Sequence, residues 1–123
     1  MKMKKHTISF KNAFNGLKWA VITQPNFKIH FFLSFLSLIG GFFFKISYFE
    51  FLIILFLIFV GLTIETINTA IEEVTDAIDL KKREDIRLAK DVAAAAMLIF
   101  SIGAFLIVCL IFIPKFLVLS FKF

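Results

Sequence analysis

The sequence predicts an all-α membrane protein, with an amphipathic helix on the membrane surface followed by three transmembrane helices. Hydrophobic residues make up 60% of the 123 residues, the mean hydropathy is +0.93, and 19 residues are phenylalanine. They stand in long apolar runs, whereas a soluble domain of this size needs polar residues over most of its surface. Because no repeat or linker divides the chain, residues 1–123 are expected to form a single membrane-embedded domain.

The N-terminal segment predicts the surface helix. Residues 8–23 repeat apolar side chains at mostly helical spacing, with polar and basic side chains between them, and Trp19 suits the headgroup level. Pro25 then predicts a break or a sharp turn. Three apolar stretches follow and predict transmembrane helices, over about 29–46, 48–65 and 92–113. The helical pattern of the second continues to about residue 80, and the third is expected to end before Pro114.

The distribution of basic residues predicts the orientation of the chain. Of the 14 lysines and arginines, six precede or begin the first apolar stretch and five lie between Lys81 and Lys90. Basic residues beside membrane segments favour the cytoplasmic side and anionic lipid headgroups, so the net charge of +5 does not indicate a nucleic-acid partner. The N-terminus and the 80–90 loop are therefore expected to be cytoplasmic, and the C-terminus outside.

An acidic stripe follows the apolar part of the second predicted span. At about 100° per residue, five side chains fall within an arc of about 80° on one helix face: Glu65, Asn68, Glu72, Asp76 and Asp79. Glu65 lies at the hydrocarbon boundary, where a carboxylate without a partner costs at least about 2–3 kcal/mol. Its position leaves three roles open: a structural ion pair, a coupling-ion site in a transporter, or a catalytic base.

Glu72 lies two turns nearer the cytoplasm and suits a hard cation such as magnesium; position alone slightly favours a solvated acid. The chain then continues to Lys90-Asp91 through a cationic loop that contains Lys81, Lys82, Arg83 and Arg87. A magnesium nucleotide needs acids for the metal and bases for the phosphates at one water-accessible surface. The chain has neither a GxxxxGK loop nor a kinase-type glycine-rich loop, which excludes the soluble nucleotide-binding folds.

Four segments carry recognisable motifs: E-T-I-N-T-A-I-E-E-V-T-D (65–76), A-K-D-V-A-A-A-A (89–96), F-K-N-A-F-N-G-L (10–17) and N-F-K-I-H (26–30). Together they resemble the bacterial diacylglycerol kinase and undecaprenol kinase family over roughly residues 8–113. The most specific part of this resemblance is the motif E-x-x-N-x-x-x-E followed downstream by A-K-D. The resemblance implies a homotrimer of three-span subunits in the bacterial cell membrane. It also implies transfer of the γ-phosphate of magnesium ATP to the hydroxyl of a membrane lipid alcohol.

The resemblance implies a role for each matching residue. Glu65 is the general base that takes the proton of the lipid hydroxyl, and Asn68 beside it orders the reacting groups. Glu72 holds the magnesium ion on the nucleotide. Lys90 and Asp91 contact the nucleotide itself.

One position departs from the family pattern. Before N-F-K-I-H the family usually has a glutamate that shares the metal, whereas this chain has Gln24, whose carbonyl ligates magnesium without bringing a charge. Gln24 is expected as a second metal and nucleotide ligand, and Asn12 as a weaker nucleotide contact. His30, at the start of a span, is expected to be an interface anchor or a hydrogen-bonding residue.

The N-F-x-I-H motif is closer to the branch found in Gram-positive bacteria, which often prefers undecaprenol, than to the branch that phosphorylates diacylglycerol. Undecaprenol is therefore the expected substrate and diacylglycerol the alternative, with undecaprenyl phosphate or phosphatidate as the product. Two interpretations from other classes stay open. One is a small ion-coupled transporter that uses Glu65, and the other is a non-catalytic assembly subunit whose acids pair with the basic loop.

Overall fold

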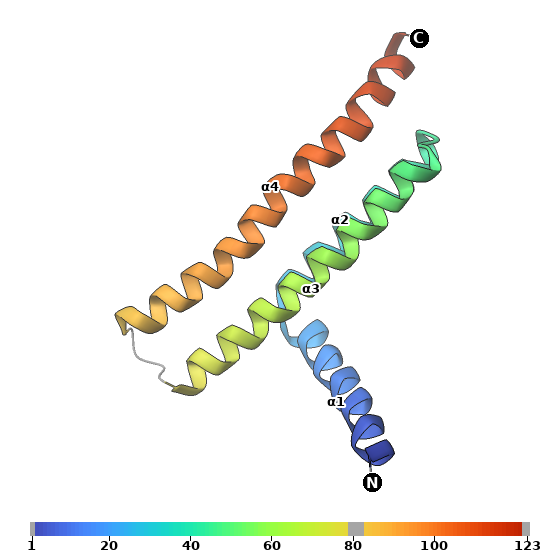
Figure 1. Cartoon of the computed structure of the whole chain (residues 1–123). Helices are drawn as coiled ribbons and strands as arrows, with labels where there is room; N and C mark the ends of the chain where they lie inside the picture. Colours follow the sequence, from blue (N-terminus) through green and yellow to red (C-terminus); the bar gives the residue numbers. More distant parts are fainter. Residues whose placement is uncertain (1, 79–82, 122–123) are drawn as a thin grey trace.

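The computed structural model describes residues 2–78 and 83–121, with side chains from Ser9 onward. This part of the chain forms four helices: α1 (Lys2–Thr23), α2 (Pro25–Phe43), α3 (Tyr48–Ile78) and α4 (Glu84–Phe121) (Figure 1). The last three are long and apolar enough to cross a membrane. The predicted all-α fold with three candidate spans is confirmed, while Asp79, Lys81 and Lys82 of the predicted site lie outside the described residues.

The helices extend beyond the apolar stretches that predicted them. Helix α2 begins at Pro25 rather than near residue 29, and α4 begins at Glu84 rather than near residue 92. Hydropathy marks only the part of a helix that suits hydrocarbon, whereas backbone hydrogen bonding continues into polar flanking turns. The polar first turns of α4 therefore belong to the same rigid element as its membrane segment.

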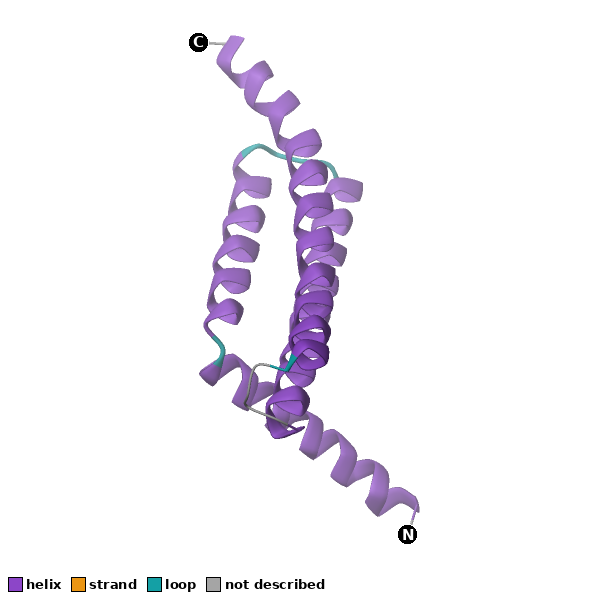
Figure 2. Ribbon diagram, turned by 90° about the vertical axis from the view of Figure 1, so that its left-hand side faces the viewer, coloured by secondary structure: helices purple, strands orange, loops and turns teal. Residues whose placement is uncertain are grey.

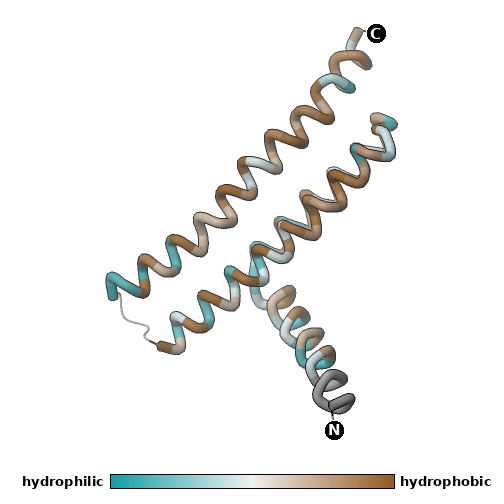
Figure 3. The backbone as a smooth tube through the Cα atoms, viewed as in Figure 1, coloured by the Kyte–Doolittle hydropathy of each residue, from teal (hydrophilic) through white to brown (hydrophobic). Residues whose placement is uncertain are grey.

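Helix α3 lies between α2 and α4 and packs against both, and α1 leaves the bundle at an angle (Figures 1 and 2). Hydrophilic residues gather at the C-terminal end of α3 and the N-terminal end of α4, which lie side by side, while the remaining length of both helices is mostly hydrophobic (Figure 3). The bundle thus has one polar end, and that end carries the acidic stripe.

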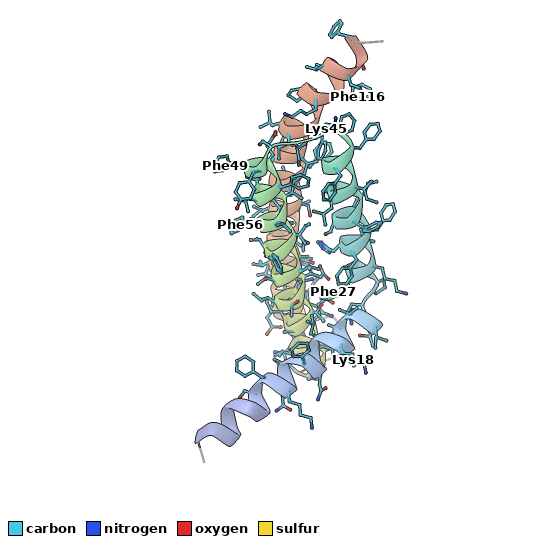
Figure 4. All side chains as sticks on the ribbon, turned by 90° about the vertical axis from the view of Figure 1, so that its right-hand side faces the viewer. Lys18, Phe27, Lys45, Phe49, Phe56 and Phe116 are labelled. Carbon is cyan, nitrogen blue, oxygen red and sulfur yellow. The ribbon has the colours of Figure 1, made fainter. Side chains whose placement is uncertain are left out.

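The break between α1 and α2 lies at Gln24 and Pro25. Gln24 is extended, with φ −99° and ψ 116°, and Pro25 begins α2, where its missing N–H costs nothing. Phe27 lies just after the break, and its fully buried side chain packs the turn between α1 and α2 against the bundle (Figure 4). Helix α1 keeps large apolar side chains exposed, among them Phe10, Phe14 and Ile22, as a helix in the membrane interface requires.

At the other end of the bundle, a short turn joins α2 to α3. Lys45 has a φ of 53° there, and Ser47 and Glu50 form a reciprocal cap on α3. The backbone N–H of Ser47 donates to Glu50 Oε1 at 2.8 Å, and the N–H of Glu50 donates to Ser47 Oγ at 3.2 Å. This cap satisfies two N–H groups at the start of the helix.

The structure corrects the predicted end of the third span, because α4 runs through Pro114 to Phe121. Proline removes one backbone hydrogen bond, a loss that membrane helices tolerate. The continued helix places Lys115 Nζ 3.3 Å from Glu50 Oε1 at the start of α3. It also projects beyond the turn between α2 and α3 (Figure 2).

Small residues set how closely the helices approach. A Cβ on Gly41 would lie 2.7 Å from Phe51 Cε1 on α3, and one on Gly61 would lie 2.7 Å from Phe100 Cε1 on α4. Both glycines therefore leave room for an aromatic ring of the neighbouring helix. The outward phenylalanines of α3, such as Phe49 and Phe56, are exposed, which suits contact with lipid (Figure 4).

Candidate active site

The acidic stripe keeps its predicted face because α3 is continuous from Tyr48 to Ile78. Glu65 is 2% exposed and Asn68 is 7% exposed, so both polar side chains are buried in the bundle. Asn68 Nδ2 donates to Glu72 Oε1 at 3.4 Å, which joins these two predicted site residues directly. Burial decreases along the stripe, since Glu72 and Asp76 are only partly buried.

Two buried oxygen atoms on this face have no hydrogen-bond partner within the described chain: Glu65 Oε2 and Asn68 Oδ1. A buried polar atom without a partner costs about 1–3 kcal/mol, and native proteins rarely leave one without a functional reason. Both atoms are acceptors, and their residues are three positions apart on one helix. They are therefore available to a donor or a cation brought by a ligand.

An apolar pocket of about 290 Å³ lies between α2, α3 and α4, and His30 is one of its lining residues. Two of its α3 residues, Ile54 and Ile58, lie on the same side of that helix as Glu65 at about 100° per residue. The remaining lining is hydrophobic apart from His30 and three serines, Ser34, Ser37 and Ser101. A hydrocarbon chain in this pocket would reach His30, whose Nε2 atom lies 3.7 Å from Glu65 Oε2.

Opposite charges meet at the polar end of the bundle. Lys90 Nζ on α4 donates to Asp76 Oδ1 on α3 at 2.5 Å, which joins the two helices near the acidic stripe. Asp91 accepts from Arg87 Nη1 at 3.4 Å. Acidic and basic side chains therefore lie close together among the described residues at this end of the bundle, where Lys90 pairs with Asp76.

Two predicted residues form no hydrogen bond or ion pair with the acidic stripe within the described residues. Gln24 Nε2 donates to Thr23 Oγ1 at 3.5 Å, and Asn12 is exposed on α1.

The donor set suits a metal that arrives with a nucleotide. Within residues 2–78 and 83–121, no three His, Cys, Asp or Glu side chains are grouped closely enough to hold a metal ion between them. Magnesium usually takes one or two carboxylates and completes its shell with phosphate oxygens and water. The Glu72 carboxylate, with the unpartnered Oδ1 of Asn68 one turn away, fits that smaller requirement.

The distance of His30 from Glu65 was not predicted from the sequence. The Nε2 atom of His30 lies 3.7 Å from Glu65 Oε2, the oxygen without a hydrogen-bond partner. His30 was expected to be an interface anchor or a hydrogen-bonding residue, and the depth at which α2 faces α3 is a tertiary property. The signal in the sequence was the position of His30 soon after Pro25, which places it near the start of α2.

Comparison with known proteins identifies the family of the chain. Residues 11–112 match the model of the prokaryotic diacylglycerol kinase family. The chain is 37% identical to an undecaprenol kinase from Bacillus subtilis strain 168, over 87% of each protein. It is 28% identical to a diacylglycerol kinase from a Synechocystis strain, over 89% of this chain and 63% of that protein. The matched region contains the acidic stripe, His30 and the Lys90-Asp91 pair, and the chain belongs to the prokaryotic diacylglycerol kinase family.

Proposed function

We propose that this chain, an ATP-dependent lipid kinase by its family, phosphorylates undecaprenol and takes its phosphate from magnesium ATP. The observation that carries the proposal is a buried carboxylate, Glu65, whose Oε2 has no hydrogen-bond partner within the described residues and lies 3.7 Å from His30, a residue that lines an apolar pocket. Undecaprenol is favoured because the relative with that name matches at 37%, against 28% for the relative named diacylglycerol kinase. A polyprenol is a hydrocarbon with one hydroxyl, which suits an apolar pocket next to one base.

Glu65 is the general base in this proposal. A lipid hydroxyl beside this carboxylate donates its proton to it as the hydroxyl oxygen attacks the γ-phosphorus of ATP, the bond from that phosphorus to the bridging oxygen breaks, and ADP leaves. Burial favours this role because a carboxylate in a water-poor site has no competing hydrogen bonds to lose first. Asn68 lies one turn away and orders the reacting groups through its amide, which already donates to Glu72.

Glu72 is the magnesium ligand in this proposal, and Gln24 is a second, uncharged one. Magnesium bound there neutralises charge on the phosphates during transfer. Glu65 and Glu72 are seven residues apart, so their Cα atoms are separated by about 10 Å along the helix. That spacing lets the carboxylate at lipid depth serve the hydroxyl while the carboxylate at the polar end serves the nucleotide.

Lys90 and Asp91 contact the nucleotide in this proposal, with Asn12 as a weaker contact. Lys90 is held at the polar end by Asp76, so its ammonium group lies near the acidic stripe before any nucleotide binds. The flexible stem of a lysine allows it to exchange a carboxylate for a phosphate without moving the helix.

The membrane arrangement is also proposed. The polar end of the bundle faces the cytoplasm, where ATP is available, and the turn at Lys45 and the C-terminus lie outside. Flanking basic residues support this orientation. The subunits form a homotrimer, and the exposed apolar faces of the three spans provide the surface for association and for lipid.

The substrate is tested with the purified full chain in detergent micelles, using magnesium, radiolabelled ATP, and undecaprenol or diacylglycerol at equal mole fraction. We expect both lipids to be labelled, with kcat/KM at least about 10-fold higher for undecaprenol because the pocket discriminates chain shape. A higher kcat/KM for diacylglycerol would reverse the substrate assignment and leave the kinase activity standing.

Replacing Lys90 with methionine is expected to raise the KM for ATP by about 10-fold, because one charge-assisted hydrogen bond to phosphate is lost. The measurement is initial rate against ATP concentration at saturating lipid. Lys115→Met is the matched control, since Lys115 also pairs with one carboxylate, that of Glu50, but lies at the opposite end of the bundle. An unchanged KM in Lys90→Met, with the variant folded, would remove Lys90 from the nucleotide site.

A further inference from the structure

His30 reaches from α2 toward the buried carboxylate on α3. Its Nε2 atom lies 3.7 Å from Glu65 Oε2, and the two side chains are 19% and 3% exposed. Oε2 is also the oxygen without a hydrogen-bond partner. Within the described residues, Glu65 is the acidic group within ion-pair distance of this imidazole. A small shift of either side chain brings the two atoms to hydrogen-bonding distance.

Neighbouring residues of α3 and α4 leave room for the imidazole ring of His30. A Cβ on Gly61 would lie 3.6 Å from His30 Nδ1 and 2.7 Å from Phe100 Cε1, so Gly61 leaves the surface of α3 open to both rings. His30 and Phe100 also line the apolar pocket. The imidazole therefore lies between the carboxylate and the pocket, where the reacting end of a lipid alcohol has to arrive.

This placement does not suit an interface anchor. An anchor keeps its polar atoms in the water or headgroup layer, whereas His30 lines an apolar pocket and directs Nε2 at a carboxylate that is 2% exposed. A purely structural ion pair would give the carboxylate a close, hydrogen-bonded partner, but His30 Nε2 stays 3.7 Å from Glu65 Oε2, which has no hydrogen-bond partner within the described residues. The remaining role is to orient a carboxylate that must stay available.

We infer that His30 is a positioning residue for Glu65 in the phosphorylation of the lipid alcohol. A hydrogen on Nε2 directed at Oε2 fixes the plane of the carboxylate, so that its other oxygen faces the pocket and the incoming hydroxyl. The inference rests on the proposed role of Glu65 as the base. It adds a residue from α2 to a site whose other members lie on α3 and α4.

The experiment compares His30→Gln and His30→Leu in the purified full chain, with magnesium ATP and whichever lipid alcohol the unmodified chain phosphorylates faster. Glutamine places an amide N–H close to the position of Nε2, whereas leucine fills the space without a donor. We expect His30→Leu to lower kcat by about 10- to 100-fold, the effect of one lost hydrogen bond to a charged group. His30→Gln should stay within about 3-fold of the unmodified chain, and the KM values for lipid and ATP should change less than about 3-fold in both.

A double variant tests whether His30 acts through Glu65. In a Glu65→Gln background, adding His30→Leu is expected to change kcat by less than about 2-fold, because the carboxylate that His30 orients is already absent. The inference would be overturned if the two substitutions lowered kcat by independent factors that multiply in the double variant. It would also be overturned if His30→Leu left kcat unchanged, or if His30→Gln lowered kcat as much as His30→Leu. Thermal unfolding in detergent checks each fold, and His30→Asn, whose amide is too short to reach Oε2, replaces the leucine variant if that variant does not fold.

These outcomes separate the inference from the proposed function. If Glu65→Gln alone leaves kcat unchanged, then Glu65 is not the base and both proposals fail. If Glu65→Gln abolishes turnover while His30→Leu does not alter it, only the role of His30 fails. A preference for diacylglycerol changes the lipid used in the assay and neither role.

Discussion

Replacing Glu65 with glutamine is expected to lower kcat by about 10³-fold, within the range that general-base catalysis contributes. Glutamine keeps nearly the same volume, so the packing around this buried side chain is preserved while the proton acceptor is removed. Because the amide does not take the hydroxyl proton, the loss should appear in kcat, with the KM for ATP nearly unchanged. The measurement is the initial rate of lipid labelling at saturating magnesium ATP.

Glu50→Gln is the matched control for this change. Glu50 is on the same helix but at its opposite end, where it caps α3 and pairs with Lys115. That variant is expected to keep its kcat within about 2-fold, since exposed or half-exposed ion pairs contribute little. Full activity in Glu65→Gln would exclude Glu65 as the base, whatever the effect at Glu50.

The second large effect is expected at Glu72. Glu72→Gln should raise the magnesium concentration for half-maximal activity by about 10-fold or more, because a neutral amide binds this hard cation more weakly than a carboxylate. Gln24 makes the effect larger, since the other proposed ligand is already uncharged and no second carboxylate compensates. The measurement is a magnesium titration of the initial rate at constant ATP.

Glu73→Gln provides a neighbouring control with the same chemical change. Glu73 is exposed and points about 80° away from the direction of Glu65, whereas Glu72 lies on the stripe and accepts a hydrogen bond from Asn68. The magnesium curve of Glu73→Gln should match that of the unmodified chain. If the two variants shift the curve equally, the effect is a general loss of negative charge at the polar end and Glu72 is not a specific ligand.

The elements of the fold followed from the sequence because their signals are local. Apolar runs long enough to cross a membrane predicted three helices, and 3.6-residue periodicity placed Glu65, Asn68 and Glu72 on one face of α3. The end of α4 was predicted wrongly at Pro114. A proline usually ends a helix, but here the contact of Lys115 with Glu50 lies on the part of α4 that continues beyond it.

The sequence did not predict which side chains of different helices would contact each other. Lys90 was expected near the acids, but its partner Asp76 depends on how far α4 is displaced along α3. His30 was expected to be an interface anchor or a hydrogen-bonding residue, and its distance from Glu65 was not predictable because it depends on how α2 packs against α3 near Gly61. Such offsets arise from side-chain packing between segments far apart in the chain, and periodicity within one helix carries no information about them.

The sequence by itself therefore determined the three apolar spans and the acidic stripe, since each depends on neighbouring residues of one helix, whereas the kinase chemistry came from the resemblance to a family. The tertiary structure alone decided which groups meet: Glu65 with His30, Asp76 with Lys90, and His30 with an apolar pocket. The physical reason is that a helix fixes the direction of its own side chains, whereas the register between helices is set by the shapes that pack between them.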